Sequence, residues 1–523
     1  MSHSQLARLR SAEAPRLHLE PPPAPLPLAW LRDLHLAWLL LPVALVKVAG
    51  LVYGVLDIDE SDWSIAGRLL GKGVLPYVGF VEKKPVLSFL FYLPAALAGY
   101  QQWVMQIVAL LWIVATALLA GRAAREWTRS DDAGRAAAWL CALGACGSIP
   151  AVNAETMMNL PAAAALFCFV RAERSRQLRD AFVTGALVAA ASLFKHQAGI
   201  LLVAFAATLS WEWLRRRSRE AGRMAALLAG FVLPWAAAAA VYWRLGHLAE
   251  FLDWNVWRNL GYAAHAAGSP VPRLMKGLVV GIAVSAPLQW WLAAREGGKL
   301  TADPVRKGLV LAFALTWVPV SMGGRFYEHY FLQFVPVLAV LAAPGALDLL
   351  ERWDELRPGL RRMLAVAALG PVLFWAGHGF VRGYLGQAPL QDWRAREIAG
   401  WVRTNSAPGD RLFVWGHYSP IYYLSDRLPG TRYYATSVHV GDFDPGHLEA
   451  GFDLSPYVSE GDVGRTIDDL ERSRTPWVID TAPSGLHGWD HAPLSVVPAL
   501  ERYVNAHYDL VAAPAGALVY RRR

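Results

Sequence analysis

The sequence has few charged residues and few cysteines for its length. Charged residues occupy 18% of its 523 positions, whereas soluble proteins carry about 25%. Hydrophobic residues make up 55%, and the mean hydropathy is +0.28. The three cysteines all lie inside apolar runs, so no disulfide framework or thiolate metal site is expected in the polar C-terminal region. This low content of charged residues, together with the high content of hydrophobic ones, excludes an ordinary soluble domain and indicates an integral membrane protein.

The N-terminal region lacks the pattern of a cleavable signal peptide. Residues 1–34 are polar and rich in proline, so we expect a cytoplasmic tail followed by an uncleaved first anchor. The formal net charge of +8 could indicate nucleic acid as a partner. However, the arginines cluster in short loops between apolar runs, as topology signals do. We therefore expect membrane lipids and no nucleic acid as partners.

Apolar runs long enough to span a bilayer recur along the chain. We predict eleven spans, at 35–55, 103–121, 135–151, 156–171, 180–195, 197–214, 224–243, 273–294, 308–323, 329–349 and 363–382. Six loops rich in basic residues alternate with loops poor in them, and placing all six in the cytoplasm conflicts with no span. The fold class is thus a polytopic α-helical membrane protein with the N-terminus inside and the C-terminus outside.

Two regions outside the spans have patterns of their own. The long first outer loop, 56–102, contains an amphipathic stretch at 60–72 and a short apolar stretch at 85–100, which predict interfacial helices. Residues 35–385 would form the membrane domain. Residues 390–523 show a helical pattern at 391–404 and strand-like runs at 411–415, 476–480, 507–512 and 517–521, which predict a soluble extracytoplasmic α/β domain.

Carboxylates crowd the start of the first outer loop. Asp57, Asp59 and Glu60 follow the first span directly, with Asp62 close behind. They could be solvated helix ends. A carboxylate at a partly desolvated interface could instead act as a general base.

Cations on the predicted outer side run against the usual charge bias. Lys83 and Lys84 could bind anionic headgroups or a lipid-linked phosphate. Glu155, in a short outer turn, could cap a helix or take part in the site. Lys195 could simply snorkel to the interface.

The turn GGRFYEHYF holds the charged cluster Arg325, Glu328 and His329, together with Tyr327, between two apolar spans. Charges in a tight turn at the membrane edge are costly unless they have partners or a ligand, so a functional role is favoured. All these clusters face the same predicted side. Such one-sided convergence of carboxylates and cations suits an anionic lipid substrate that meets a polar partner.

At this point the residues resemble a known family. The run DESDWSIAGRLLGKGVLPYVGFVEKKPVLSFLFYLPAAL, with Asp59-Glu60, Pro76 and Lys84-Pro85, resembles the first outer loop of GT-C glycosyltransferases. The likeness is greatest to the protein O-mannosyltransferase and lipid A aminoarabinose transferase family. The later HYFLQFVP, from His329 to Pro336, looks like the His-Tyr…Pro element of that family.

The resemblance implies a bacterial plasma-membrane enzyme. It would move a sugar, with inversion, from a polyprenyl-phosphate donor to a lipid, glycan or protein acceptor. Asp59 would be the catalytic base, with Glu60 and Glu155 as further catalytic residues. Lys84 would bind the donor phosphate, together with Lys83, Arg325 and His329. Glu155 falls where the family has a second acidic residue, and Lys83 adds a charge. A divalent metal is possible by the resemblance, although the sequence has no compact ligand set.

Alternative functions remain open from the sequence. Paired Lys83 and Lys84 would suit a glycan ligase or polymerase with a lipid-diphosphate donor. A lipid or glycan transporter would bind near the bilayer midplane, between repeated halves, and the sequence shows no internal repeat. The C-terminal region could also act as a sensor, and its run VWGHYSPIYYLSDRLPGTRYY is rich in aromatic residues.

Overall fold

The computed structural model describes residues 37–216, 220–260, 270–299, 303–443, 448 and 452–523. The predicted tail at 1–34 lies outside these residues. Residues 39–523 form one compact unit, within which everything below is described. The boundary predicted near residue 390 therefore stays a prediction.

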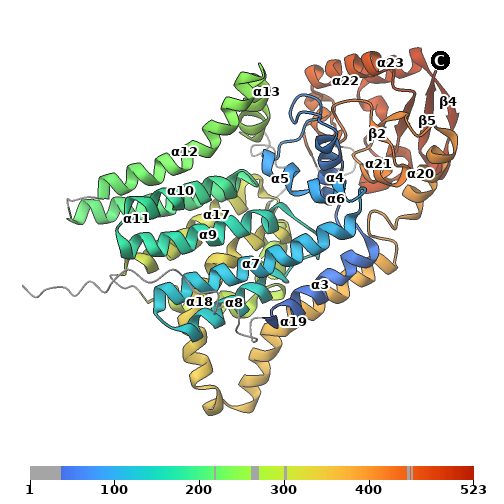
Figure 1. Ribbon diagram of the computed structural model, residues 1–523. Helices are drawn as coiled ribbons and strands as arrows, with labels where there is room; N and C mark the ends of the chain where they lie inside the picture. The colour runs from blue at the N-terminus through green and yellow to red at the C-terminus, as the bar shows by residue number, and fades with distance from the viewer. Residues whose placement is uncertain (1–36, 217–219, 261–269, 300–302, 444–447, 449–451) are drawn as a thin grey trace, which may run out of the picture. The chain divides into compact units, whose positions relative to one another are not determined.

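Each range predicted to span the membrane overlaps a helix. The long helices are α3 (Leu40–Tyr53), α7 (Gln102–Thr128), α8 (Asp131–Ala145), α9 (Ala154–Ser175), α10 (Leu178–Ser192), α11 (Ile200–Arg216), α12 (Glu220–Arg244), α16 (Pro287–Gly297), α17 (Pro304–Ser321), α18 (Val335–Glu351) and α19 (Pro358–Tyr384). Shorter helices are α13 (Leu248–Leu252) and α15 (Pro270–Leu278). They assemble into the helical part of Figure 1.

Six stretches in the described part of the chain are long and apolar enough to cross a membrane. Two bent pairs raise this number to eight if each pair counts as one span. In one pair, α3 meets α4 (Ile58–Gly71) at 70°; in the other, the segment Val271–Val284 meets α16 at 94°. The chain is thus a multi-pass membrane protein by length and composition, and the sharp bend at 285–286 divides the range predicted as a span at 273–294.

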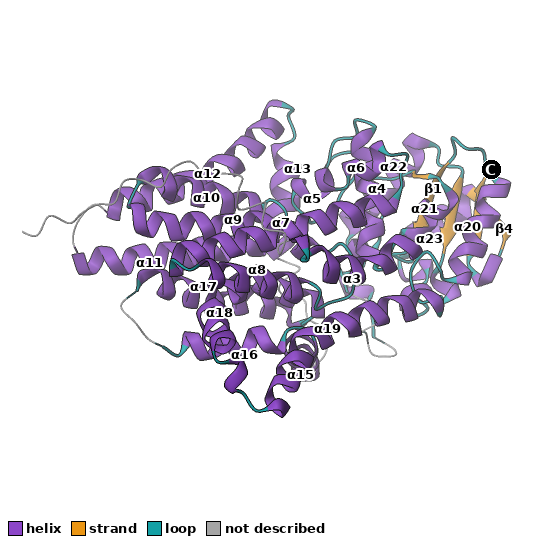
Figure 2. Cartoon of the chain, turned by 60° about the horizontal axis from the view of Figure 1, so that its bottom comes forward, coloured by secondary structure: helices purple, strands orange, loops and turns teal. Residues whose placement is uncertain are grey.

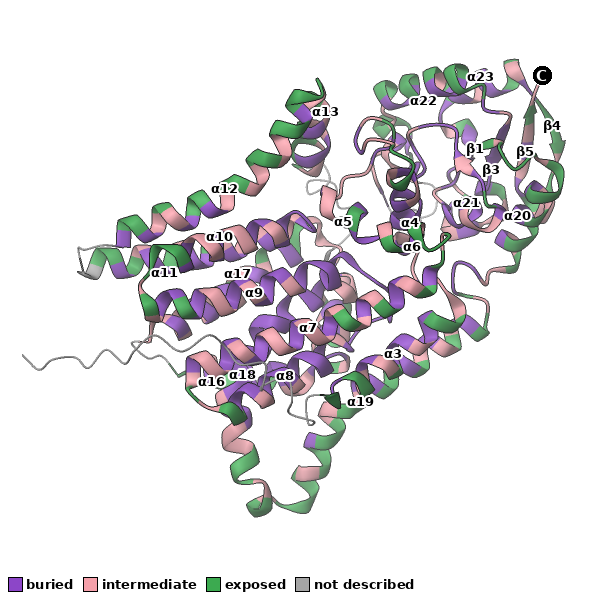
Figure 3. Ribbon diagram, in the orientation of Figure 1, coloured by how far each residue is buried: buried purple, intermediate pink, exposed green. Residues whose placement is uncertain are grey.

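Burial distinguishes helices inside the bundle from those on its surface. In the most apolar stretch of α18, 89% of the residues are buried, against 11% in α12. Figure 3 shows the same contrast between the purple interior helices and the largely exposed α12. Val232, Leu233 and Val241 of α12 are more than half exposed. An apolar surface of this kind is suited to contact with lipid.

The first loop folds into short helices, as predicted. Helix α4 begins with a capping box: the Asp57 side chain accepts from the Asp59 backbone N–H, while the Glu60 side chain accepts from the Asp57 N–H. Helices α5 (Val86–Phe91) and α6 (Leu93–Leu97) follow Pro85. Together they are too short to cross a bilayer.

The C-terminal region is an α/β structure with a five-stranded sheet in the order β2-β1-β3-β5-β4. The strands are β1 (Arg411–Trp415), β2 (Leu428–Pro429), β3 (Trp477–Asp480), β4 (Tyr508–Ala512) and β5 (Leu518–Arg522). Strand β1 pairs in parallel with β2 and β3, whereas β5 runs antiparallel to β3 and β4. Figure 2 shows these strands gathered at one end of the chain. The helices of this region are α20 (Trp393–Asn405), α21 (Pro420–Ser425), α22 (Glu460–Ser473) and α23 (Pro498–His507).

Helix α4 joins the helical part to the sheet. It lies beside α21 (Figure 1), and its Ile65, Ala66 and Leu69 share one buried cluster with Val414 and Ile421 of the sheet region. Because this shared core is apolar, the loop that carries Asp57 and Asp59 cannot move independently of the C-terminal region.

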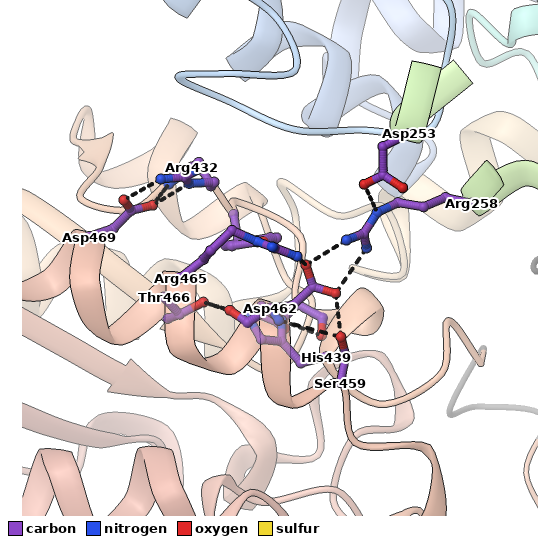
Figure 4. Close-up of polar contacts among 11 residues, drawn as sticks. Asp253, Arg258, Arg432, His439, Ser459, Asp462, Arg465, Thr466 and Asp469 are labelled. Carbon is purple, nitrogen blue, oxygen red and sulfur yellow. Dashed lines mark hydrogen bonds and ion pairs between the residues drawn. The ribbon is translucent and has the colours of Figure 1, made fainter. Parts of the chain in front are cut away.

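A second connection between the two regions is polar. Arg258 donates two hydrogen bonds to the Asp462 carboxylate, at 2.9 and 2.8 Å, and a third to Asp253 (Figure 4). Ser459 and Arg465 also donate to Asp462. Burial opposes ionisation, but these partners hold the pKa of Asp462 well below its usual range. The charged pair therefore persists at neutral pH and fixes the helical segment after α13 to α22.

Candidate functional site

A cavity lies where the ends of several helices meet the C-terminal sheet region. Its walls come from the start of α4, the 82–85 loop, the start of α9, the turn between α10 and α11, and the turn before α18. The segments that follow β1, β2 and β3 complete it, with His417, residues 437–443 and His487. The segments that the sequence placed on one side of the membrane therefore meet at one cavity.

Most residues singled out from the sequence line this cavity. They are Asp57, Asp59, Lys83, Lys84, Glu155, Lys195, Arg325, Tyr327 and His329. Glu60, although next to Asp59, is not among the lining residues. Neighbouring positions on the first turn of α4 thus face different surroundings.

Glu60 is buried, and its carboxylate holds two loops together by hydrogen bonds. Its Oε2 accepts from the backbone N–H groups of Leu56 and Asp57, at 2.7 and 3.2 Å. Its Oε1 accepts from the Val152 N–H and the Gln106 side chain, at 2.7 and 3.0 Å. Both oxygens therefore hold the Asp57 segment against the loop that leads to Glu155, and the catalytic role expected for Glu60 stays a prediction.

We expect Glu60→Gln to destabilise the protein by about 2 kcal/mol. An amide NH₂ would face two of the N–H donors that the carboxylate now satisfies, leaving buried donors unpaired. The measurement is the melting temperature of the detergent-solubilised protein, with the exposed Glu355→Gln as the control. Equal melting temperatures for both variants would contradict this stabilising role of Glu60.

Asp57 and Asp59 both face the cavity but have different local roles. The Asp57 side chain caps α4 by accepting from the Asp59 N–H at 3.1 Å. Asp59 lies within electrostatic reach of Lys84, His329, His417 and Lys195, with Lys84 exerting the strongest attraction among them. Two lysines therefore act on Asp59, whereas the basic groups that act on Asp57 are His329 and Arg382.

Lys83 and Arg325 both contact Asp442 from the C-terminal region. The Lys83 Nζ lies 2.7 Å from the Asp442 carboxylate, and the Arg325 guanidinium donates to the Asp442 carbonyl oxygen at 3.1 Å. Burial alone would raise the pKa of Asp442, but Lys83, Ser437 and Arg325 together lower it. Asp442 is therefore ionised and offsets the charge of Lys83.

Glu155 and Lys195 form a buried ion pair at the cavity floor. Both side chains are at least nine-tenths buried, and the Lys195 ammonium also lies over the Tyr330 ring, 4.4 Å from its centroid. Glu155 and Lys195, for which the sequence left both a structural and a functional role open, are thus partners. They join the start of α9 to the end of α10.

Comparison with known proteins agrees with this architecture. Residues 82–243 match the family model of the dolichyl-phosphate-mannose-protein mannosyltransferases. The fold is similar to that of ArnT from Cupriavidus metallidurans in a crystal structure bound to undecaprenyl phosphate, with a TM-score of 0.61 and 13% identity over 95% of this chain and 98% of that one. The apo structure of that ArnT gives a TM-score of 0.57 and 15% identity, over 93% and 98%. Comparison with curated protein sequences finds no match.

The chain has the fold of a GT-C membrane glycosyltransferase. The resemblance drawn from the first outer loop is therefore confirmed at the level of the superfamily. The matched family segment begins at Glu82, immediately before the two cavity lysines, and continues through Glu155 and Lys195 to the end of α12.

The cavity also includes residues that the sequence did not single out. His417, Ser437, Asp442 and His487 line the cavity from the C-terminal region. Gly416-His417, directly after the β1 strand, was a usable signal, because loops at the carboxyl ends of parallel strands are frequent ligand sites. Asp442 had no signal, since its loop has no periodic pattern.

A metal is not supported by the side chains described. Among those residues, no three His, Cys, Asp or Glu side chains are grouped so that they could hold a metal ion. The steps derived below for this GT-C fold therefore use only its own side chains.

Proposed function

We propose that this chain is an inverting glycosyltransferase that moves a sugar from a polyprenyl phosphate to a hydroxyl-bearing acceptor at the outer face of the plasma membrane. The observation that carries the proposal is the meeting of Asp59 and Lys84 in one cavity at the ends of apolar helices. A base and a phosphate-binding cation side by side are the two groups that such a transfer requires.

The reaction is a single displacement. The acceptor oxygen attacks the anomeric carbon, and its proton passes to the Asp59 carboxylate. The bond from the anomeric carbon to the phosphate oxygen breaks, and the polyprenyl phosphate leaves with the electron pair. Lys84 stabilises the negative charge that grows on this phosphate. Attack from the face opposite the leaving group inverts the anomeric configuration, so no covalent intermediate on the protein is needed.

The charge distribution favours a monophosphate donor over a diphosphate. Two adjacent lysines would suit a diphosphate if both charges were available to it. However, Lys83 lies 2.7 Å from the Asp442 carboxylate, which offsets its charge. Lys84 exerts the strongest attraction on the proposed base, Asp59, among the charged groups around it. One cation next to the reacting centre matches the single negative charge of a sugar joined to one phosphate, which is a phosphodiester.

The proposed topology keeps the predicted orientation, with the N-terminus inside and the C-terminus outside. Helix α9 has 22 residues, about 33 Å, which is close to the thickness of the hydrocarbon core. It carries Glu155 at the cavity end and Glu173 and Arg174 at the other, where Glu173 pairs with the buried Arg223. If this arginine-rich end faces the cytoplasm, the cavity and the C-terminal region lie outside.

The position of the cavity also separates an enzyme from a transporter. Secondary transporters bind substrate near the bilayer midplane, between repeated halves. Here the charged residues gather at the ends of α9, α10 and α18, beside the C-terminal sheet region. A site at the membrane edge favours chemistry on a lipid-linked group over passage through the bilayer.

The proposal is tested with purified protein in lipid nanodiscs. We expect it to bind undecaprenyl phosphate, and to release or transfer labelled sugar from undecaprenyl-phosphate sugars, with inversion at the anomeric carbon. An undecaprenyl-diphosphate glycan serves as the competing donor. Turnover of the diphosphate alone would support the ligase alternative. Movement of intact lipid across the bilayer without bond cleavage would support a transporter.

A further inference from the structure

Two histidines of the C-terminal region stand in the wall of the cavity that holds Asp59. His417 follows β1 and His487 follows β3, and both line the cavity. Strands β1 and β3 are parallel neighbours, so the loops at their carboxyl ends emerge side by side. In open α/β sheets this edge is where ligands bind. The sheet therefore presents its ligand-binding edge to the reaction centre.

Both histidines are held in an unfavourable backbone conformation. His417 has φ 48° and His487 has φ 54°, in the left-handed region that side chains other than glycine rarely adopt. Gly416, just before His417, has φ 109°, and a Cβ added there would overlap the Thr481 hydroxyl. Strain of this kind concentrates at functional sites, where the surrounding structure enforces it.

Specific contacts fix the His417 ring in place. Its backbone N–H donates to the Thr436 hydroxyl at 2.9 Å, and Thr436 is fully buried. The imidazole is stacked with His487, at 5.8 Å between ring centroids, and with the fully buried Trp489, at 6.1 Å. The ring cannot swing away from the cavity without giving up both stacking partners.

The C-terminal wall is also tied to the opposite wall of the cavity. Asp442 contacts Lys83 and Arg325, as described above, and its carboxylate accepts from Ser437 at 3.2 Å. The Arg258–Asp462 pair adds a second attachment farther away. His417 therefore has a fixed position relative to Asp59, within its electrostatic reach.

We propose that His417 contacts the acceptor beside Asp59 and, with His487, forms the acceptor side of the reaction centre. The lysine side of the cavity would hold the donor phosphate, while the imidazole of His417 holds the acceptor hydroxyl by a hydrogen bond. This inference rests on the proposed function. It assigns the C-terminal region a direct part in substrate selection, beyond any role as a sensor.

The test separates acceptor use from donor use in the full-length protein. The probes are undecaprenyl phosphate carrying a labelled sugar and the envelope fraction that receives label from the wild type. Release of free labelled sugar, with water as the acceptor, measures donor use alone. The test variant is His417→Asn, because asparagine tolerates the left-handed backbone. The matched control is His507→Gln, on α23 and outside the cavity.

For His417→Asn we expect the apparent KM for the envelope fraction to rise about tenfold, because the variant loses roughly one good hydrogen bond to the acceptor. Sugar release to water and the affinity for undecaprenyl phosphate should stay within about twofold of wild type. Gly416→Ala, which displaces the same turn, should raise the same KM. His507→Gln should behave as wild type.

Three outcomes would overturn the inference. An unchanged acceptor KM in His417→Asn would remove the acceptor contact and leave the proposed function standing. A parallel fall in transfer, sugar release and undecaprenyl phosphate affinity would show a structural role only. If the wild type neither releases nor transfers sugar from any of the labelled donors, the proposed function fails and this inference fails with it.

Discussion

Asp59→Asn is expected to reduce sugar transfer by about 10²- to 10⁴-fold while leaving the affinity for undecaprenyl phosphate nearly unchanged. An amide cannot accept the acceptor's proton, and loss of a general base has an effect of this size. Asparagine keeps the volume of the side chain and preserves the capping of α4, which depends on the backbone N–H of residue 59. The effect should therefore appear in kcat and not in donor binding.

Asp57→Asn is the matched control for this prediction. Asparagine caps helices as well as aspartate does, so α4 should begin at the same place. We expect Asp57→Asn to keep transfer within about tenfold of wild type. If Asp57→Asn loses transfer and Asp59→Asn retains it, the base is Asp57, and the arrangement of cations around Asp59 has another purpose.

The sequence predicted the helical framework well, because apolar length and basic loops are strong local signals. Each predicted span overlaps a helix, and the strand-like runs at 411–415 and 476–480 became adjacent parallel strands. The bend between η4 (Val279–Val284) and α16 was not predicted. It occurs at Ser285-Ala286-Pro287 inside one continuous apolar run, where hydropathy carries no information about direction.

Side-chain partners were harder to predict than positions. Asp59 and Glu60 are adjacent in sequence, yet one faces the cavity and the other braces the loops below it. That difference depends on Val152 and Gln106, which are far away in the chain. Likewise, the pairing of Lys83 with Asp442 joins residues that only the folded C-terminal region brings together.

Lys84→Met should weaken undecaprenyl phosphate binding and reduce transfer by about 10²- to 10³-fold. The methionine side chain keeps the apolar stem but removes the charge that faces the departing phosphate, and removal of one such electrostatic stabiliser has an effect of this order. The loss should be greater in transfer than in affinity, because negative charge on the bridging oxygen grows in the transition state. Binding is measured by titration in nanodiscs and transfer with labelled donor.

Lys83→Met, one residue away, shows whether transfer depends on the position of the lysine or only on the net charge of the cavity. Both variants lower the net charge of the cavity by one unit and conserve shape equally. Lys83 is already paired with Asp442, so its removal should reduce transfer about tenfold or less, in part by loosening the C-terminal wall. Equal losses for both lysines would mean that the donor's charged group spans both of them. That result would favour a diphosphate donor, because only a longer anion can draw Lys83 away from a buried carboxylate.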